Sequence, residues 1–484
     1  MVGMDVMISL HFLADDVIVS IHKSTIRVLE ETGLRVSNEE ARNLLVKEGC
    51  TTNGDIVKIP KALVEESIQK VPSNFAMYNF EGEKSWQVGL DRVIFNPASS
   101  AVYFKDRETQ DIRKGKVADV VELVRLVEGL EYVGFQSTAL VPSDVPEPIS
   151  GHYRLFLTLM NSTKPIVTGA FSKDGLNEMK LMLEVVTGGS DELARRPRAI
   201  FDCCPTSPLT WGDTTCQNLM DCADAGIPAA IVPAPLSGAT SPITIHGTLI
   251  QSNAEILTGV VLSQLKRPGS PIIYGGAAGS FDMKYGTPRF GAVEAMMTSC
   301  ASAELGKHYG FPTHSYLGGS DSKAVDAQSG YESGLGFILG ALARINVISG
   351  PGMLAHLNCQ SLEKLVIDNE ICGTAFRLIR GVGVETIEAI TELISNVGSD
   401  GDYLRQKHTS KMLRSEHFMP SSLIDRLSTD SWRAEGSKDI LERARERVSS
   451  ILKDHSPIDL SPDLEKEMKS VMEKVAAKYK VSLD

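Results

Sequence analysis

The sequence predicts an α/β protein built on a (β/α)8 barrel of the TIM type, with a helical segment before the barrel and a helical extension after it. Between about residues 115 and 385, short β-branched or small-residue runs alternate with amphipathic stretches, which is typical of parallel strands joined by crossover helices. Seven or eight such units within about 270 residues match the size of a barrel. A doubly wound sheet usually has fewer strands and a G-x-G-x-x-G turn after the first one, and here the first run leads into STALVPSDVPEP instead.

Residues 1–75 are predicted to form a helical segment that precedes the barrel. Apolar residues recur at helical spacing over residues 15–32. Ser37 can cap a second helix that runs to about Lys47, and Pro60 opens a third.

Residues 76–385 form the predicted barrel domain. Its first part, to about residue 112, is irregular and strand-like, with alternating patterns in DRVIFNP and AVYFKD. An eighth barrel strand is predicted either at AVYF near residue 101 or at RGVGVET near residue 380, and the pattern favours neither. The seven clear strand predictions are YVGFQSTALV (132–141), PIVTGAF (165–171), AIFDCC (199–204), PAAIVPA (228–234), PIIYGG (271–276), PTHSYLGG (312–319) and INVISG (345–350).

Residues 386–484 are predicted to form a helical extension packed on the barrel. Its last segments, LERARERVSSILKDH and SPDLEKEMKSVMEKVAAKYKV, carry many charges at i,i+4 spacing. Such charges are typical of a solvated helix face rather than of a binding surface.

Charge and composition exclude several classes of function. There are 49 Lys and Arg against 61 Asp and Glu, a formal net charge of −12 without a basic cluster, so nucleic acid and an anionic membrane are not expected as partners. No run of 18 apolar residues occurs, and the first residues lack the basic region and cleavage site of a secretory signal. The eight cysteines are scattered through apolar contexts, which suits a reducing compartment. We therefore expect a cytoplasmic protein.

In a barrel the reacting groups come from the carboxyl ends of the strands and the loops that follow them. Any one of these residues could instead be a hydrogen-bonded structural group. The candidates are Gln136, Ser137, Thr138, Thr168, Phe171, Asp202, Cys203, Pro233, Pro235, Tyr274, His314, Tyr316, Ser320, Asp321, Ser349 and His356.

Two loops stand out among these positions. GGSDSKAVDAQSGYE, residues 318–332, follows a predicted strand, and its two glycines allow the backbone to approach a ligand closely. Ser320 or Asp321 could also simply cap the next helix. SGPGMLAHLN, residues 349–358, carries His356 over the predicted mouth of the barrel, where it could bind a carboxylate, carry a proton or pack against a carbonyl.

Other known site patterns are weak or missing. YGGAAGSFDMKYG, residues 274–286, is rich in glycine but lacks the Lys-Ser/Thr of a phosphate loop. There is no C-x-x-C or H-E-x-x-H spacing for zinc and no G-x-S-x-G for a serine hydrolase. We expect no metal site and no tightly bound cofactor, and the residue chemistry assigns no catalytic group.

Several long segments together resemble the trimethylamine methyltransferase superfamily. They are GGSDSKAVDAQSGYE, the GPGML loop, LVIDNEICG and the long stretch GDYLRQKHTSKMLRSEHFMPSSLIDRLSTDSWRAEGSKDILERARERV. The resemblance extends over nearly the whole chain, including the helical segment at its start and the turn DRETQDIRKGKVADV.

This resemblance implies a (β/α)8 barrel that transfers a methyl group from an N-methylated amine to the Co(I) corrinoid (cobalamin) of a separate carrier protein. The archaeal trimethylamine enzymes contain pyrrolysine in the region similar to residues 318–332, whereas this chain has only standard residues. It therefore resembles the branch that demethylates quaternary amines such as glycine betaine, proline betaine or carnitine, and glycine betaine is the expected substrate. One-carbon metabolism of the methanogenic or acetogenic kind would use such an enzyme.

The resemblance also suggests how the substrate is held. Aromatic faces bind quaternary ammonium groups, and the expected cage residues are Tyr316, Tyr274, Tyr103 and Phe171. We expect His356, with loop amides at Gly319 and Ser320, to bind the carboxylate, and Asp321 to be a distant counter-charge or a loop anchor.

The expected partners are the corrinoid carrier, the small quaternary amine and further copies of the chain in a homo-oligomer. The alternatives are another barrel enzyme, such as a zinc-dependent methyltransferase or an aldolase-like protein, and a non-catalytic betaine-binding relative.

Overall fold

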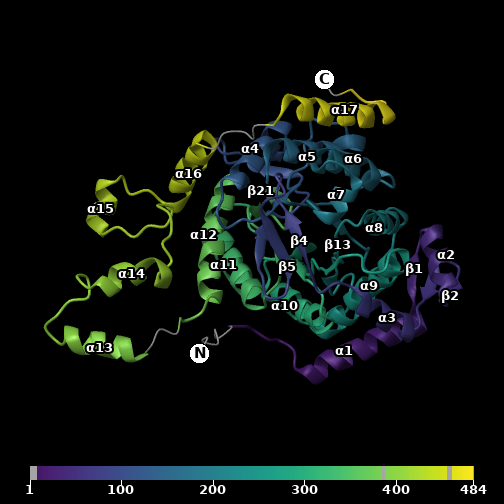
Figure 1. Cartoon of the computed structure of the whole chain (residues 1–484), viewed down its shortest axis with the longest axis horizontal. Coiled ribbons are helices and arrows are strands. Elements are labelled where there is room, and N and C mark those ends of the chain that lie inside the picture. The colour runs from purple at the N-terminus through teal and green to yellow at the C-terminus, as the bar shows by residue number, and fades with distance from the viewer. Residues whose placement is uncertain (1–7, 384–386, 455–459, 483–484) are drawn as a thin grey trace.

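The structure is a computed structural model, and it describes residues 8–383, 387–454 and 460–482. It is a mixed α/β protein in which short parallel strands at the centre are surrounded by helices (Figure 1). The central strands are β6 (Ile94–Asn96), β9 (Gln136–Ser137), β10 (Ile166–Thr168), β11 (Ala199–Cys203), β13 (Ala229–Ile231), β15 (Ile272–Tyr274), β18 (His314–Tyr316) and β19 (Val347–Ser349).

The central strands follow one another in a ring. One parallel sheet has the order β15-β13-β11-β10-β9, and another has β18-β19-β6. A parallel bridge between Phe95 and Val133 joins β6 to the segment just before β9, and one between Tyr274 and Thr313 joins β15 to the start of β18. The cyclic order is therefore β6-β9-β10-β11-β13-β15-β18-β19, as in a (β/α)8 barrel.

Each of the seven clear strand predictions contains one central strand, so these predictions are confirmed. The AVYF candidate for the eighth strand is wrong, and the RGVGVET candidate lies partly outside the described residues. The eighth strand is β6, within DRVIFNP, and it pairs in parallel with β19 from Ile94↔Val347 to Asn96↔Ser349. AVYF instead forms β7 (Tyr103–Lys105), which pairs with strands outside the ring. Residues 380–383 follow the last barrel helix, and residues 384–386 lie outside the described part.

The pleat of the central strands divides their residues between two cores. Val167, Ile200, Ala230 and Ile273 point inward and form one cluster with Met77 and Val88 of a β-hairpin. The hairpin, β4 (Asn74–Tyr78) and β5 (Ser85–Gly89), is bonded to residues that precede β10 and β11, so it covers the amino ends of the ring. The neighbouring strand residues face the helices, since successive side chains of a strand point to opposite sides.

The helices that surround the ring carry one apolar face each or are almost wholly buried. Helix α9 is covered on its outer side by α1 and α3, and most of its 22 residues are buried. The surrounding helices are α4 (Val117–Glu128), α5 (Glu147–Asn161), α6 (Gly175–Thr187), α7 (Ser190–Arg195), α8 (Asp213–Ala225), α9 (Ile245–Lys266), α10 (Val293–His308), α11 (Ala327–Leu342) and α12 (Leu362–Ile379).

Short strands also form within the loops that connect the central strands and the helices. β20 (Met353–Leu354), β21 (Cys359–Gln360), β7 and β8 (Ile112–Lys114) form one small sheet. β14 (Leu236–Ser237), β16 (Gly279–Asp282) and β17 (Thr287–Arg289) form another. Both sheets include loop residues that follow central strands, and they build up the carboxyl-terminal side of the ring.

The amino-terminal segment contains the three predicted helices, α1 (Asp15–Arg27, continued by a π-helical turn Val28–Thr32), α2 (Glu39–Lys47) and α3 (Lys61–Lys70). It is not wholly helical, because β1 (Leu34–Val36), β2 (Thr51–Asn53) and β3 (Ile56–Lys58) form a sheet with β12 (Thr210–Trp211). The cap of α2 is also one residue later than predicted, since the side chain of Asn38 accepts from the amide of Ala41 at 2.9 Å. The boundary predicted between residues 75 and 76 falls inside β4.

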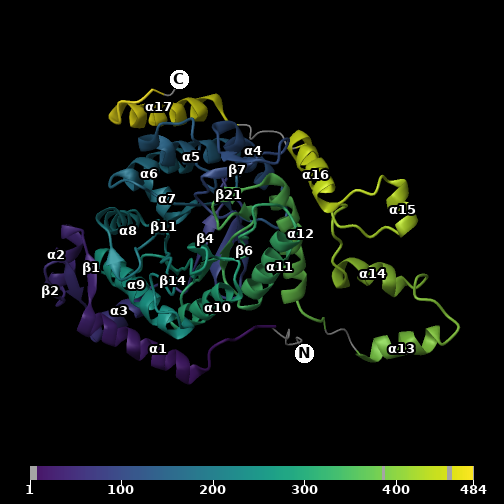
Figure 2. The same cartoon turned by 180° about the vertical axis from the view of Figure 1, so that it is seen from behind.

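The carboxyl-terminal segment has two parts. Helices α13 (Ile387–Val397), α14 (Lys407–Glu416) and α15 (Thr429–Ala434) have no buried residue and extend away from the barrel (Figure 1 and Figure 2). Helices α16 (Ile440–Asp454) and α17 (Pro462–Lys478) pack on α12, α5 and α6. The boundary predicted between residues 385 and 386 lies outside the described residues. None of the described helices has the length and apolar character of a membrane span.

Candidate functional site

Two side chains meet inside the ring at the carboxyl ends of strands that are not neighbours. Tyr316 ends β18, and its hydroxyl donates to Oδ2 of Asp202, on β11, at 2.8 Å. The same hydroxyl oxygen lies 2.5 Å from Oγ of Ser99, which follows β6. Because β11 and β18 are separated by two other strands, this contact spans the interior of the ring. Tyr316 and Asp202 each keep part of their surface accessible.

The Asp202 carboxyl is electrostatically unusual. Burial raises its pKa to about 7, and the hydrogen bond from Tyr316 offsets only part of that effect. Burial and the nearby carboxylate also raise the pKa of Tyr316 well above its ordinary value. The phenol therefore keeps its proton and donates a hydrogen bond to Asp202. Oδ1 of Asp202 has no hydrogen-bond partner among the described residues. An anionic oxygen in such a place is suited to receive a cation or a proton.

A neutral hydrogen-bonded layer lies next to this pair. Nε2 of His314 is 2.8 Å from Oγ of Ser349, which donates to the side chain of Asn96 at 2.8 Å. Burial lowers the pKa of His314 to about 3, so its imidazole is neutral, and because the Ser349 hydroxyl donates to Asn96, its oxygen is available to accept from an Nε2–H. The imidazole and the Tyr316 ring meet edge to face at 5.2 Å. The layer therefore holds the Tyr316 ring in place without adding charge.

Helix α5 contributes an arginine to the same end of the ring. Arg154 is only 2% exposed, and its Nη1 donates to the carbonyl of Thr138, just after β9, at 2.9 Å. Its guanidinium lies 5.2 Å from the ring of Phe171, which is 66% exposed in the loop after β10. Burial lowers the pKa of Arg154 to about 10, which still leaves it charged at neutral pH. Nε of Arg154 has no hydrogen-bond partner among the described residues.

The loop after β18 is held by its own side chains. The Asp321 carboxylate accepts from the amides of Phe290 and Gly291 at 3.0 and 3.1 Å, and Ser320 donates to Glu332 at 2.5 Å. Burial raises the pKa of Asp321. Through these contacts Asp321 anchors the segment before α10.

His356 joins this loop network. Its Nδ1 lies 3.2 Å from Oδ1 of Asp321, and its Nε2 accepts from the Lys323 ammonium at 2.9 Å. Residues 355–357 all have left-handed backbone, with φ between 51° and 60°. A buried ion pair also anchors the loop after β19, which carries His356. Lys364 lies 2.5 Å from one oxygen of Asp368, and the other oxygen accepts from the amide of Gly352. The structure thus places His356, Asp321, Ser320 and Gly319 in neighbouring loops, where the contacts described are with other residues of the protein.

Tyr274 does not belong to the mouth of the ring, contrary to the prediction. It is 1% exposed, its hydroxyl donates to Asn253 of α9 at 2.9 Å, and its ring packs beside Tyr309 and Phe311. The side chain points outward because it has the opposite pleat phase to Ile273, which faces the interior. Tyr103, on β7, is 37% exposed in the small sheet outside the ring.

Sequence reasoning placed Tyr316, Asp202, His314 and Ser349 at strand ends but gave a role to Tyr316 alone. It missed Ser99 and Arg154. Ser99 follows the strand that was not assigned to the barrel, and Arg154 lies within a helix, where an arginine is usually on the solvated face. Neither carries a local sequence signal.

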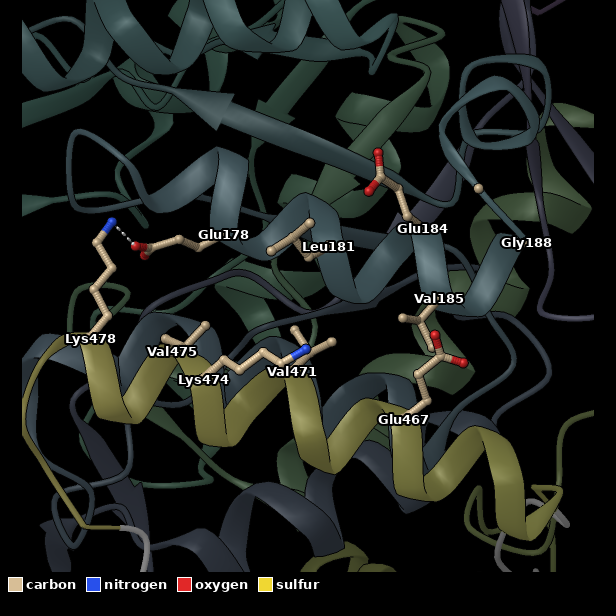
Figure 3. A pocket seen from close by; sticks show the side chains of 11 residues that line it. Glu178, Leu181, Glu184, Val185, Gly188, Glu467, Val471, Lys474, Val475 and Lys478 are labelled. Carbon is tan, nitrogen blue, oxygen red and sulfur yellow. Dashed lines mark hydrogen bonds and ion pairs between the residues drawn. The ribbon is translucent and has the colours of Figure 1, made fainter.

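A separate groove of about 700 Å³ lies on the outside of the molecule, between α6 and α17 (Figure 3). Leu181 and Val185 face Val471 and Val475 across it, and Glu178 pairs with Lys478 at one end. None of the residues at the strand ends lines it. The groove lies where α17 packs on α6, and it does not contain the candidate site.

The described residues contain no group of three or more His, Cys, Asp or Glu side chains placed to hold a metal ion. All eight cysteines lie in the described part, and they are free thiols. The polar and aromatic groups at this end of the ring include the Asp202 carboxyl, the Tyr316 phenol, the Arg154 guanidinium and the exposed ring of Phe171.

Known proteins are similar to this chain in sequence over nearly its whole length. The chain is 31% identical over 471 residues to trimethylamine methyltransferase MttB of Desulfitobacterium hafniense (strain DSM 10664 / DCB-2), covering 97% of this chain and 95% of that protein. It is 29% identical over 462 residues to glycine betaine methyltransferase of D. hafniense (strain Y51), covering 95% and 96%.

A solved structure shows the same fold at low identity. The crystal structure of monomethylamine methyltransferase (MtmB) of Methanosarcina barkeri superposes with a TM-score of 0.55 at 12% identity, covering 93% of this chain and 89% of that one. The family described as "Trimethylamine methyltransferase (MTTB)" matches residues 5–479. The chain belongs to this trimethylamine methyltransferase family.

Proposed function

We propose that the protein transfers a methyl group from a quaternary amine to the Co(I) corrinoid of a separate carrier protein. Glycine betaine is the favoured substrate, and dimethylglycine is then the product. The family assignment and the two relatives support methyl transfer from methylated amines or betaines. We infer that the cyclic strand order is a closed barrel and that amine and corrinoid meet at its carboxyl-terminal mouth.

The observation that carries the proposal is the pair of Asp202 and Tyr316. One carboxylate oxygen accepts a hydrogen bond from the phenol, and the other has no partner among the described residues. A quaternary ammonium has no N–H to donate, so it is recognised by negative charge and by aromatic faces. Asp202 supplies the charge, and the rings of Tyr316 and Phe171 supply the faces. We assign no residue that forms or breaks a bond.

The residues of the chain favour a quaternary over a tertiary amine. The segment Gly318 to Glu332 has only standard residues, so it offers no electrophile that could make a tertiary amine cationic. A quaternary ammonium already carries its charge. The Co(I) electron pair forms the bond to the methyl carbon, and the C–N pair stays on nitrogen, giving methyl-Co(III) and a neutral tertiary amine without proton transfer. The protein then acts by positioning and electrostatics.

The test is methylation of free cob(I)alamin by the purified protein, followed by the absorbance of methylcob(III)alamin. We expect turnover of glycine betaine and at least tenfold slower turnover of trimethylamine, because the latter needs activation. A reaction without amine is the control. Equal rates with the two amines would show that the leaving-group argument is wrong, and no methylcobalamin from any quaternary amine would contradict the proposed function.

We also propose a protein partner, an oligomeric state and a cellular compartment. A corrinoid carrier protein is the partner, and the chain assembles as a homo-oligomer in the cytoplasm. These expectations follow from the resemblance and the composition of the chain.

A further inference from the structure

The mouth of the ring contains a buried cation as well as an unsatisfied anion. Arg154 is 2% exposed, and its neighbours are a carbonyl, a hydroxyl and an aromatic ring: Thr138 at 2.9 Å, Ser100 at 3.4 Å and Phe171 at 5.2 Å. None of these carries a negative charge. A buried guanidinium normally has a carboxylate or phosphate partner, because desolvation of an unpaired charge is costly.

The two charged groups belong to one site. Tyr316, bonded to Asp202, also contacts Ser99, and the next residue, Ser100, contacts Arg154. Tyr316 and Arg154 also interact electrostatically, although burial has the larger effect on the pKa of Arg154. An anion and a cation are therefore held on either side of one short backbone segment at the carboxyl ends of the strands.

We propose that Arg154 binds the carboxylate of the substrate while Asp202 and Tyr316 face its trimethylammonium. The substrate class is then a betaine-type zwitterion, in which a short spacer separates the two charges, and not a simple tetraalkylammonium. This inference rests on the proposed function for the identity of the reaction but not for the binding geometry. A guanidinium suits this role because its planar fork can donate two parallel bonds to a carboxylate.

Arg154 replaces His356 as the carboxylate anchor for a physical reason. Nε2 of His356 already accepts from the Lys323 ammonium at 2.9 Å, and its Nδ1, which has no hydrogen-bond partner among the described residues, lies 3.2 Å from Oδ1 of Asp321. A substrate carboxylate placed at His356 would also meet the Asp321 carboxylate, which would repel it. Nε of Arg154 has no such competitor among the described residues.

The chain offers a matched control in Arg198. It is also buried, at 7% exposure, its guanidinium lies 5.0 Å from the ring of Phe80, and burial lowers its pKa to about 10 as well. Arg198 directly precedes β11, however, so it lies at the amino ends of the strands. The two arginines differ chiefly in which end of the ring they occupy.

Calorimetric titration of the full chain with glycine betaine, and separately with choline, tests the inference without corrinoid. For Arg154→Gln we expect the Kd of glycine betaine to rise about 10- to 100-fold, as for loss of a charge-assisted hydrogen bond, and that of choline to change less than threefold. Arg198→Gln should bind both as the parent does. Melting temperatures of all variants report whether each is folded.

The outcomes separate this inference from the proposed function. Equal betaine affinity in Arg154→Gln and Arg198→Gln, or an equal loss for betaine and choline, would overturn the inference even if methyl transfer is observed. An Arg154-dependent betaine Kd without methyl transfer would support the inference and contradict the function. If Arg154→Gln does not fold, Arg154→Lys decides, since it keeps the charge but loses the fork and should weaken betaine binding selectively.

Discussion

At the residue scale, the Asp202 carboxyl has the most consequential environment in the protein. Burial raises its pKa to about 7 from an ordinary value of 3.8, against the effect of the Tyr316 hydroxyl. A carboxyl kept partly protonated near neutral pH loses that proton readily when a cation arrives beside it. Binding of a quaternary ammonium should therefore release protons near pH 7, and affinity should increase as the pH rises through that value.

The same shift makes a stability prediction for Asp202→Asn. Because the folded pKa is raised, the folded state binds more protons than the unfolded state between about pH 4 and pH 7, so this group's contribution to the free energy of unfolding falls as the pH rises through that window. Asparagine removes the effect and can still accept from Tyr316. We expect the variant to gain on the order of a few kcal/mol relative to the parent at pH 8, and much less at pH 5.

Thermal unfolding of Asp202→Asn and the parent at both pH values checks this prediction. His314 is a useful internal comparison, because its pKa is lowered to about 3 and its contribution therefore falls as the pH decreases below about 6.5. A stability difference that is the same at pH 5 and pH 8 would mean that Asp202 is not buried as described.

His356→Ala distinguishes a loop anchor from a carboxylate ligand. Since Lys323 donates to Nε2 and the Asp321 carboxylate lies 3.2 Å from Nδ1, we expect a loss of stability of about 1 to 2 kcal/mol with little change in the ratio of betaine to choline affinity. Urea unfolding and the two Kd values provide the measurements. A ten- to hundredfold loss confined to glycine betaine would instead establish the carboxylate role that the sequence predicted.

At the scale of elements, the loop after β18 depends on two glycines. Gly318 has φ of +81°, and a Cβ there would lie 2.2 Å from Cε1 of Phe337, a fully buried ring of α11. A Cβ on Gly319 would lie 2.1 Å from Leu357. The loop that carries Ser320 and Asp321 can therefore lie against α11 only with glycine at position 318, whereas a side chain at position 319 would require the Leu357 side chain to move.

Gly318→Ala should destabilise the protein by about 2 to 4 kcal/mol, the sum of overpacking and left-handed backbone strain. Gly334→Ala is the matched control, because Gly334 lies in α11 with nothing within 4 Å of its Cβ position, and alanine there should stabilise by about 0.5 to 1 kcal/mol. Urea unfolding of both variants measures the difference. If the two substitutions had equal effects, the close packing of this loop would be in doubt.

At the scale of the whole molecule, catalysis is expected to need nothing beyond the chain, the amine and the corrinoid. The described residues provide no set of three metal-ligating side chains, and the sequence lacks metal-ligand spacings. We expect dialysis against a chelator to leave more than about 80% of methyl transfer, as for an enzyme that works by positioning and electrostatics. Elemental analysis accompanies the assay. Stoichiometric zinc that is lost together with activity would disprove this prediction.

Most of the ring could be predicted from the sequence, because seven apolar runs of strand length alternate with helices. The eighth could not. Ile94–Asn96 resembles the other short strands in its neighbourhood, and it enters the barrel only because β19 and the segment before β9 offer edges on either side. Pairing between segments far apart in sequence is a tertiary property, and a three-residue strand has too little pattern to reveal it.

The sequence by itself indicated the family, seven of the eight central strands and the end of the ring at which we place the candidate site. The tertiary structure alone decided which strand-end residues face inward. Tyr274 and Tyr316 both end predicted strands, yet Tyr274 packs against α9 and Tyr316 reaches Asp202 across the ring. Parallel strands covered on both faces are apolar on both faces, so their sequences do not reveal the phase of the pleat. Helix-borne Arg154 joins the site for the same reason, since only packing brings it there.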